Sequence, residues 1–184
     1  MADKDAVEKL LWSIALPGLG QLLNEKYIKG IVLIFLELLV NVQGNLNKII
    51  LLSFHGDIEK AIQQAYYQWL MFYPCLYFFA MWDAFKDAGG EKSRFAFLPF
   101  VFAAYFMTVG TIYSTKLTLF GVLLGPIWLP ILCANPGLFV GFFLLLAYFK
   151  GLYKNRLSRT LTTASTALKS SIMQSLSYSV QWAR

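Results

Sequence analysis

Hydrophobic residues fill long stretches of this chain, and three of these stretches carry no charged side chain. They run from Ala61 to Trp82, from Phe95 to Thr115 and from Leu117 to Phe149, with 22, 21 and 33 residues. About 20 apolar residues are enough for a helix to cross the hydrocarbon layer of a bilayer, whereas a soluble domain needs charges on the outer face of its helices. The pattern therefore predicts an all-α, polytopic membrane helix bundle of about four to six segments.

The polar interruptions divide the chain further. The first segment, Leu10 to Asn24, has only 15 uncharged residues, and it is broken by Pro17-Gly18. This break predicts a half-helix, a re-entrant piece or a kinked helix. The segments and polar loops expected after it are a helix over 28–47, a loop over 48–60, a helix over 66–82 kinked at Pro74, a loop over 83–94 and a helix over 95–113.

The last hydrophobic region, 117–149, is too long for one straight span and short for two complete ones. Gly125-Pro126, Pro130 and Asn135-Pro136-Gly137 interrupt it. Two interpretations stay open. Either Asn135-Pro136-Gly137 turns a tight hairpin between two short helices, or a re-entrant piece within 117–135 precedes a single span.

The sequence predicts an integral membrane helical domain over 1–149 and a basic, Ser/Thr-rich tail over 150–184. Apolar residues recur in the tail at steps of three and four between Leu157 and Val180. This spacing predicts an amphipathic helix that lies on the inner leaflet or pairs with a partner. A frayed polar extension is the alternative.

Charge bears on partners and on orientation. The chain is 58% hydrophobic and 14% charged with a net charge of +6, and the whole excess of positive charge lies in the tail. A basic segment beside a membrane domain is attracted to anionic lipid headgroups, and no folded basic module indicates nucleic-acid binding. The positive-inside rule places the tail, the 83–94 loop and the Lys26/Lys29 turn in the cytoplasm and the 48–60 loop outside. This orientation in the cytoplasmic membrane requires 117–149 to make a net single crossing.

The second segment carries a candidate intramembrane polar site. Glu37, Asn41 and Asn45 are spaced by four, so they stack on one face of a helix. An ionisable residue within a span is a functional candidate, and a proton or cation pathway would use such a stripe. The alternative is structural, with Glu37 hydrogen-bonded across helices to an Asn, to Gln21 or to a lysine.

Asp83 and Asp87 form a second candidate, an interfacial acidic pair one turn apart at the end of a predicted helix. Two carboxylates so placed can face a cation or a phosphate-bearing headgroup. Pairing with a lysine at the membrane surface is the structural alternative.

Catalytic motifs are missing from the sequence. A single histidine provides neither a triad nor a metal cluster, and no Gly-rich phosphate loop occurs. Cys75 and Cys133 lie inside apolar runs, where buried small hydrophobes are expected. The sequence therefore predicts a non-enzymatic protein without catalytic, cofactor-binding or metal-binding residues.

The opening segment carries a family resemblance. Pro17-Gly18-Leu19-Gly20-Gln21 is followed by Asn24, Tyr27 and Lys29-Gly30, and Trp82-Asp83 comes later. The pattern resembles the opening of bacterial proteins of the TM-two domain type, in which a Gly-rich short helix and a polar turn lead into a second helix that ends near an Asp. Trp82-Asp83 is similar to that closing Asp but follows an extra segment. The resemblance implies a small integral membrane protein whose helix-packing motif comprises Pro17, Gly18, Gly20, Gln21 and Gly30.

A similar opening also precedes some sugar-permease subunits of ABC transporters. Such subunits carry a cytoplasmic Glu-Ala-Ala loop that docks the ATPase. Ile127-Trp128-Leu129-Pro130 resembles the end of that loop, but the acidic part is missing and the region is apolar. A complete permease is therefore not expected.

Together these features predict a structural or accessory component of a membrane complex. Its expected partners are the lipid bilayer and either another membrane protein or a second copy of the chain. The alternative is a small transporter or channel subunit that uses Glu37 with Asn41 and Asn45.

Overall fold

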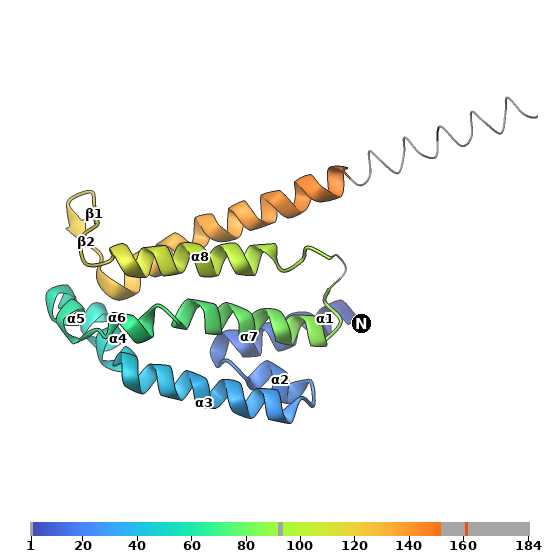
Figure 1. Ribbon diagram of the computed structural model, residues 1–184, viewed down its shortest axis with the longest axis horizontal. Helices are drawn as coiled ribbons and strands as arrows, with labels where there is room; N and C mark the ends of the chain where they lie inside the picture. The colour runs from blue at the N-terminus through green and yellow to red at the C-terminus, as the bar shows by residue number, and fades with distance from the viewer. Residues whose placement is uncertain (1, 92–93, 152–160, 162–184) are drawn as a thin grey trace, which may run out of the picture. The chain divides into compact units, whose positions relative to one another are not determined.

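The computed structural model describes residues 2–91, 94–151 and 161, and these are predominantly helical (Figure 1). The chain divides into two units, Met1–Leu145 and Leu146–Arg184. The elements are α1 (Ala2–Ala15), α2 (Leu19–Leu23), α3 (Tyr27–Gly44), α4 (Leu46–Phe54), α5 (Ile58–Gln64), α6 (Tyr67–Leu70), α7 (Tyr73–Asp87), α8 (Leu98–Tyr113), β1 (Thr118–Leu119), β2 (Val122–Leu123) and a helix from Gly125 to Gly151. The predicted all-α class is confirmed, and β1 and β2 are the only strands in the described ranges.

The first segment is broken where the sequence predicted. α1 ends at Ala15, and α2 begins at Leu19 after Gly18, whose φ of 106° is a left-handed conformation that glycine adopts freely. The helix starts earlier than expected, at Ala2 instead of Leu10. It takes in charged residues because Ala6 and Ser13 are buried while Lys4, Asp5 and Glu8 are exposed.

The predicted polar loop over 48–60 is wrong. α3 ends at Gly44, and Asn45 turns the chain with a φ of 57°, so that α4 runs from Leu46 to Phe54. α4 forms because Leu46 and Ile49 are buried against Ala61 and Leu70. Only a short turn at His55–Asp57 separates α4 from α5.

Two further boundaries differ from prediction. Pro74 does not kink a continuous helix but lies in the first turn of α7, where its missing N–H costs no helical hydrogen bond. α7 also continues to Asp87, so the hydrophilic connection begins at Ala88 and not at 83. The expected fourth helix is confirmed as α8, which likewise carries a proline in its first turn.

The structure of 117–149 differs from both interpretations. Residues 118–123 form a hairpin of β1 and β2, with Thr118 opposite Leu123, and no re-entrant helix occupies 117–124. One helix then runs from Gly125 to Gly151. Pro136 lies inside this helix, so Asn135-Pro136-Gly137 does not form a hairpin. Membrane-type helices tolerate an internal proline where neighbouring groups satisfy the freed backbone.

Small residues join the Gly125–Gly151 helix to α8. A Cβ added at Gly137 would lie 2.6 Å from the carbonyl oxygen of Phe102, and one added at Gly141 would lie 2.5 Å from the Cα of Pro99. On the α8 side, a Cβ added at Gly110 would lie 2.9 Å from the Cα of Pro130. Small residues at such spacing allow helix backbones to approach closely.

Two helices in the described part are long and apolar enough to cross a membrane, α3 and the Gly125–Gly151 helix. α8 is apolar but shorter, with 16 residues, and α7 is separated from α6 by the turn before Tyr73. The bundle of four to six spans therefore stays a prediction, as does the division into 1–149 and 150–184. The predicted amphipathic tail helix lies outside the described residues, except for Leu161.

Candidate functional site

The first three helices bring small residues into tight contact. A Cβ added at Gly18 would lie 2.5 Å from the carbonyl oxygen of Gly30, so the turn before α2 rests on the first part of α3. A Cβ added at Gly20 would lie 2.1 Å from Ser13 Oγ and 2.7 Å from Ala84 Cβ. Gly20 is therefore the point at which α1, α2 and α7 meet.

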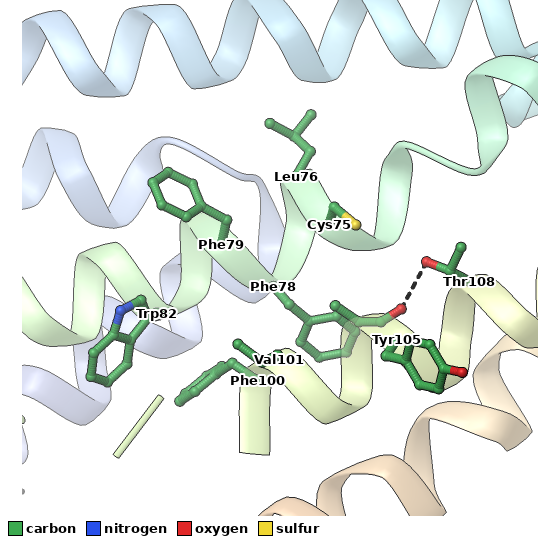
Figure 2. Close-up of a pocket in the computed structure, with 10 residues that line it drawn as sticks. Cys75, Leu76, Phe78, Phe79, Trp82, Phe100, Val101, Tyr105 and Thr108 are labelled. Carbon is green, nitrogen blue, oxygen red and sulfur yellow. Dashed lines mark hydrogen bonds between the residues drawn. The ribbon is translucent and has the colours of Figure 1, made fainter. Parts of the chain in front are cut away.

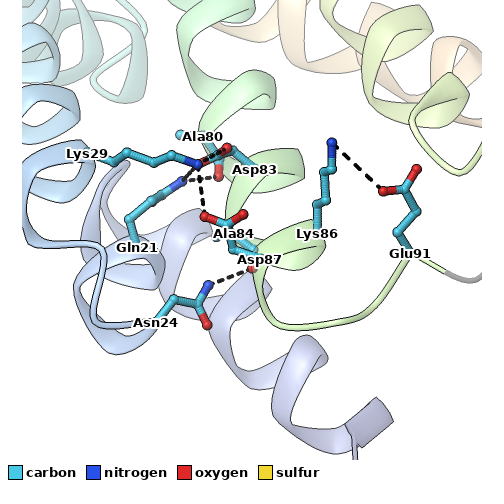
Figure 3. A network of polar contacts seen from close by, with 9 residues as sticks. All are labelled: Gln21, Asn24, Lys29, Ala80, Asp83, Ala84, Lys86, Asp87 and Glu91. Atoms are coloured by element: carbon cyan, nitrogen blue, oxygen red, sulfur yellow. Dashed lines mark hydrogen bonds and ion pairs between the residues drawn. The ribbon is translucent and has the colours of Figure 1, made fainter.

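Lys29 lies beside this contact and joins α3 to α7 (Figure 3). Its ammonium lies 2.8 Å from Asp83 Oδ1 and 2.9 Å from Asp87 Oδ2. The side chains of Asp83 and Asp87 are 14% and 19% exposed and that of Lys29 is 49% exposed. Because the two acids are one helical turn apart, a single lysine reaches both.

Two amide side chains extend the same contact. Gln21, which is fully buried, donates from Nε2 to the carbonyl oxygen of Ala80 at 2.8 Å and to Asp83 Oδ2 at 3.2 Å. Asn24 donates from Nδ2 to the carbonyl oxygen of Ala84 at 2.8 Å. We call Gln21, Asn24, Lys29, Asp83 and Asp87 the Lys29 cluster.

The Lys29 cluster brings together residues that are far apart in sequence. The predicted packing residue Gln21 and the predicted acidic pair are separated by about 60 positions, yet they share one hydrogen-bond network. Gln21 bonds to α7 and not to Glu37. The sequence predicted a lysine as one possible partner of the acids but did not identify Lys29, and it predicted no hydrogen bond for Asn24.

Glu37 lies on the buried face of α3, with 6% of its surface exposed. Its carboxyl group accepts a hydrogen bond from the hydroxyl of Tyr73 in α7. Its second oxygen, Oε2, has no hydrogen-bond partner among the described residues. Tyr77, one turn after Tyr73, donates instead to the carbonyl oxygen of Ile14 at 2.6 Å. Glu37 is thus held between α3 and α7 by a tyrosine that sequence analysis did not pair with it.

Of the predicted stripe, Glu37 and Asn41 lie one turn apart in α3, and Asn45 leaves it. Asn41 donates to Asn47 Oδ1 at 3.2 Å, and Asn45 donates to the carbonyl oxygen of Gln64 at 3.0 Å. The physical reason is that α3 ends at Gly44, so Asn45 leaves the helix with a positive φ and its side chain turns toward the end of α5.

Cys75 corrects another expectation, because its side chain is exposed whereas Cys133 is partly buried. No group of three or more His, Cys, Asp or Glu that would hold a metal ion occurs in 2–91, 94–151 or 161.

Comparisons of the chain with protein-family models, with curated proteins and with solved structures find no match. The resemblance to the TM-two domain type therefore stays an expectation. The features that bear on function are the Lys29 cluster, Glu37 and the distribution of apolar surface.

Proposed function

We propose that the chain is an integral protein of the cytoplasmic membrane that serves as a non-enzymatic structural or accessory component of a membrane complex. Its partners are the bilayer and either another membrane protein or a second copy. The observation that carries this proposal is the Lys29 cluster, in which polar side chains of α2 and α3 bond to α7 instead of lining a path between the helices.

Exposed apolar side chains support the membrane placement. They cover the outer faces of α3, α8 and the Gly125–Gly151 helix, where large side chains are exposed in succession. Contiguous apolar surface beyond a few hundred Å² is rare on soluble monomers and marks a membrane or a partner. These exposed residues include Ile28, Phe35, Val42, Val101, Tyr105, Phe139 and Phe143.

Four crossings account for the order of the elements: α3, α6 with α7, α8 and the Gly125–Gly151 helix. α3 and α7 run in opposite directions, since Lys29 meets Asp87 at one end and Gly44 meets Leu70 at the other. α1 and α2 then form a re-entrant piece. This piece enters the membrane at the end of α7 that holds Ala84. Its Ile14 bonds to Tyr77 further along α7, and its Asn24 lies back at the starting end, where it bonds to Ala84.

This count supports the orientation derived from charge. With four crossings, the Lys29 end of α3, the connection between α7 and α8 and the tail all lie on one side, which the positive-inside rule makes the cytoplasm. A single helix after the β1–β2 hairpin provides the net single crossing that this orientation requires.

Cysteine accessibility tests the placement. Single cysteines at positions 55, 90, 116 and 170 are introduced after replacement of Cys75 and Cys133, and a membrane-impermeant maleimide is applied to intact cells and to opened membranes. We expect positions 55 and 116 to react in intact cells and positions 90 and 170 to react only after opening. Reaction of position 90 in intact cells would contradict the orientation, and reaction of all four in a soluble fraction would contradict the membrane placement.

A transporter or channel subunit is the second candidate, and it is favoured by Glu37 Oε2, which has no hydrogen-bond partner in the part of the chain that the structure describes. Reconstituted vesicles separate the two. The accessory role predicts that the parent chain gives no proton or cation flux above empty vesicles and that Glu37→Gln stays folded. Flux that is lost in Glu37→Gln and retained in the exposed-acid control Glu59→Gln would establish the second candidate instead.

A further inference from the structure

A groove of about 620 Å³ lies between α7 and α8 (Figure 2). Its walls are apolar and aromatic, with Phe79 and Trp82 on α7 and Val101 and Tyr105 on α8. The hydroxyl of Thr108 at its far end donates within α8, to the carbonyl oxygen of Ala104 at 2.8 Å, and is therefore already satisfied. The volume falls in the range of roughly 300–1,000 Å³ that is typical of small-molecule sites.

A cation follows the groove one turn further along α7. Cys75, Phe79, Trp82 and Lys86 follow one another at steps of four, three and four, so they lie on one helix face. The first three line the groove, and Lys86 comes one turn beyond Trp82. At 1.5 Å per residue, the distance along the helix from Cys75 to Lys86 is about 16 Å. One leaflet of the hydrocarbon layer is about 15 Å thick.

Charge at this end of the groove favours an anion. Lys86 is exposed, and its ion pair with Glu91, at 3.9 Å, is longer than the 2.8 Å pair of Lys29 with Asp83. Arg94 is exposed and precedes Phe97, whose ring lies 6.2 Å from that of Trp82. Asp83 and Asp87 do not oppose an anion here, because both are bound to Lys29 on the side that faces α3.

The geometry points to a binding site for one anionic glycerophospholipid, with an acyl chain in the groove between α7 and α8 and the phosphate beside Lys86 and Arg94. The occupant is a lipid and not a second protein, because the distance along α7 from Cys75 in the groove to Lys86 is close to the thickness of one leaflet, so that a cation stands where the headgroup layer begins. Trp82, near that end, is a residue type that favours the membrane interface. This site rests on the proposed membrane placement. It adds that the protein selects a lipid with an anionic headgroup.

Lipid retention tests the site. The full chain is purified in detergent, stripped of lipid, mixed with phosphatidylglycerol or phosphatidylcholine, and examined by native mass spectrometry. We expect one phosphatidylglycerol to be retained and phosphatidylcholine to bind more weakly. Loss of the two cations in Lys86→Gln with Arg94→Gln should lower phosphatidylglycerol retention by about fivefold for each cation. The charge control, Lys60→Gln with Lys116→Gln, should leave retention unchanged.

A matched pair of substitutions on α8 tests the groove itself. Val101 lines the groove and is 53% exposed, whereas Ile112 lies outside it and is 51% exposed. We expect Val101→Trp to abolish retention of phosphatidylglycerol and Ile112→Trp to preserve it. Equal retention by both variants, or equal retention of the two lipids by the parent, would overturn the site. A dimer that disappears in Val101→Trp would also overturn it, in favour of a second copy in the groove.

Alkylation of Cys75 gives a second measurement that needs no groove substitution. In a Cys133→Ala background, phosphatidylglycerol should slow the reaction of Cys75 with a maleimide, and phosphatidylcholine should not. Absence of protection would overturn the lipid site. Flotation with phosphatidylcholine vesicles separates this failure from failure of the membrane placement, because a membrane protein without the site still floats.

Discussion

The ammonium of Lys29 lies 2.8 Å from the carboxylate of Asp83, although the two residues are 54 positions apart in sequence. This pair fixes how α3 and α7 are aligned, because Lys29 is in the first turn of α3 and Asp83 is in the last part of α7. Gln21 bonds to the same carboxylate from α2. One acidic side chain therefore sets the relative position of three helices.

Removal of the cation should destabilise the protein more than removal of a surface lysine. Lys29→Met leaves Asp83 and Asp87, both largely buried, without a counter-ion. Exposed pairs contribute up to about 1 kcal/mol and broken buried pairs cost about 3–5 kcal/mol. We expect a loss of about 2 kcal/mol in the free energy of unfolding, since Lys29 itself is half exposed, measured by chemical unfolding in detergent micelles.

The matched control is Lys60→Met, because Lys60 pairs with Asp57 at 3.1 Å within one helical turn and both side chains are much more exposed. Its expected cost is below about 0.5 kcal/mol. Equal losses in Lys29→Met and Lys60→Met would show that the Lys29 cluster does not stabilise the bundle. Neutralisation of Asp83 and Asp87 to Asn in the Lys29→Met background should recover part of the loss.

Gly18→Ala tests the close approach of the turn before α2 to α3. Gly18 and Gly56 both have positive φ, at 106° and 84°, but only at Gly18 would a Cβ meet other atoms. Gly56→Ala should therefore cost only the left-handed conformation, about 1–2 kcal/mol. Gly18→Ala should cost about 1–3 kcal/mol more from overpacking against Gly30. Similar melting temperatures for the two variants would rule out the tight contact.

The pairing of Glu37 with Tyr73 predicts a non-additive effect. Tyr73→Phe removes the hydroxyl that donates to a buried carboxyl and should cost about 1–3 kcal/mol. Tyr66→Phe, at an exposed tyrosine, should be neutral. Glu37→Leu combined with Tyr73→Phe should be less destabilising than the sum of the single changes, because neither partner is left unsatisfied. Additive losses in this double-mutant cycle would contradict the pairing.

The sequence predicted which segments are helical better than where each helix ends. Charge-free runs marked α8 and the region of α7, because an apolar run of that length has few alternatives to a helix. The 48–60 segment was predicted to be a loop because polar residues lie at both of its ends. It contains helices instead, because Ile49 and Leu52 pack in a cluster with Ala61 and Leu70. Asn135-Pro136-Gly137 is a turn signal in water, yet packing against α8 holds this stretch in one helix.

The candidate site was predictable by residue type but not by partner. Asp83 and Asp87 were expected to face a cation or a phosphate-bearing headgroup, or to pair with a lysine, and they bond to Lys29. That choice depends on the alignment of α3 with α7, which no local pattern encodes. The stripe of Glu37, Asn41 and Asn45 assumed a helix that continues through Asn45. The left-handed conformation of Asn45 at the end of α3 removes its side chain from the face that Glu37 and Asn41 share.

Two glycines of the Gly125–Gly151 helix should respond in opposite ways to substitution by alanine, because only one of them lies against α8. A Cβ at Gly141 would lie 2.5 Å from the Cα of Pro99 and 2.7 Å from the carbonyl oxygen of Leu98, whereas a Cβ at Gly151 would meet nothing within 4 Å. Because the atoms at Gly141 belong to the backbone of α8, the helices must move apart, and Gly141→Ala should cost about 1–3 kcal/mol. Gly151→Ala should stabilise the helix by about 0.5–1 kcal/mol. Thermal unfolding in detergent should therefore shift the midpoint down in the first variant and slightly up in the second, and shifts of the same sign would contradict close packing at Gly141.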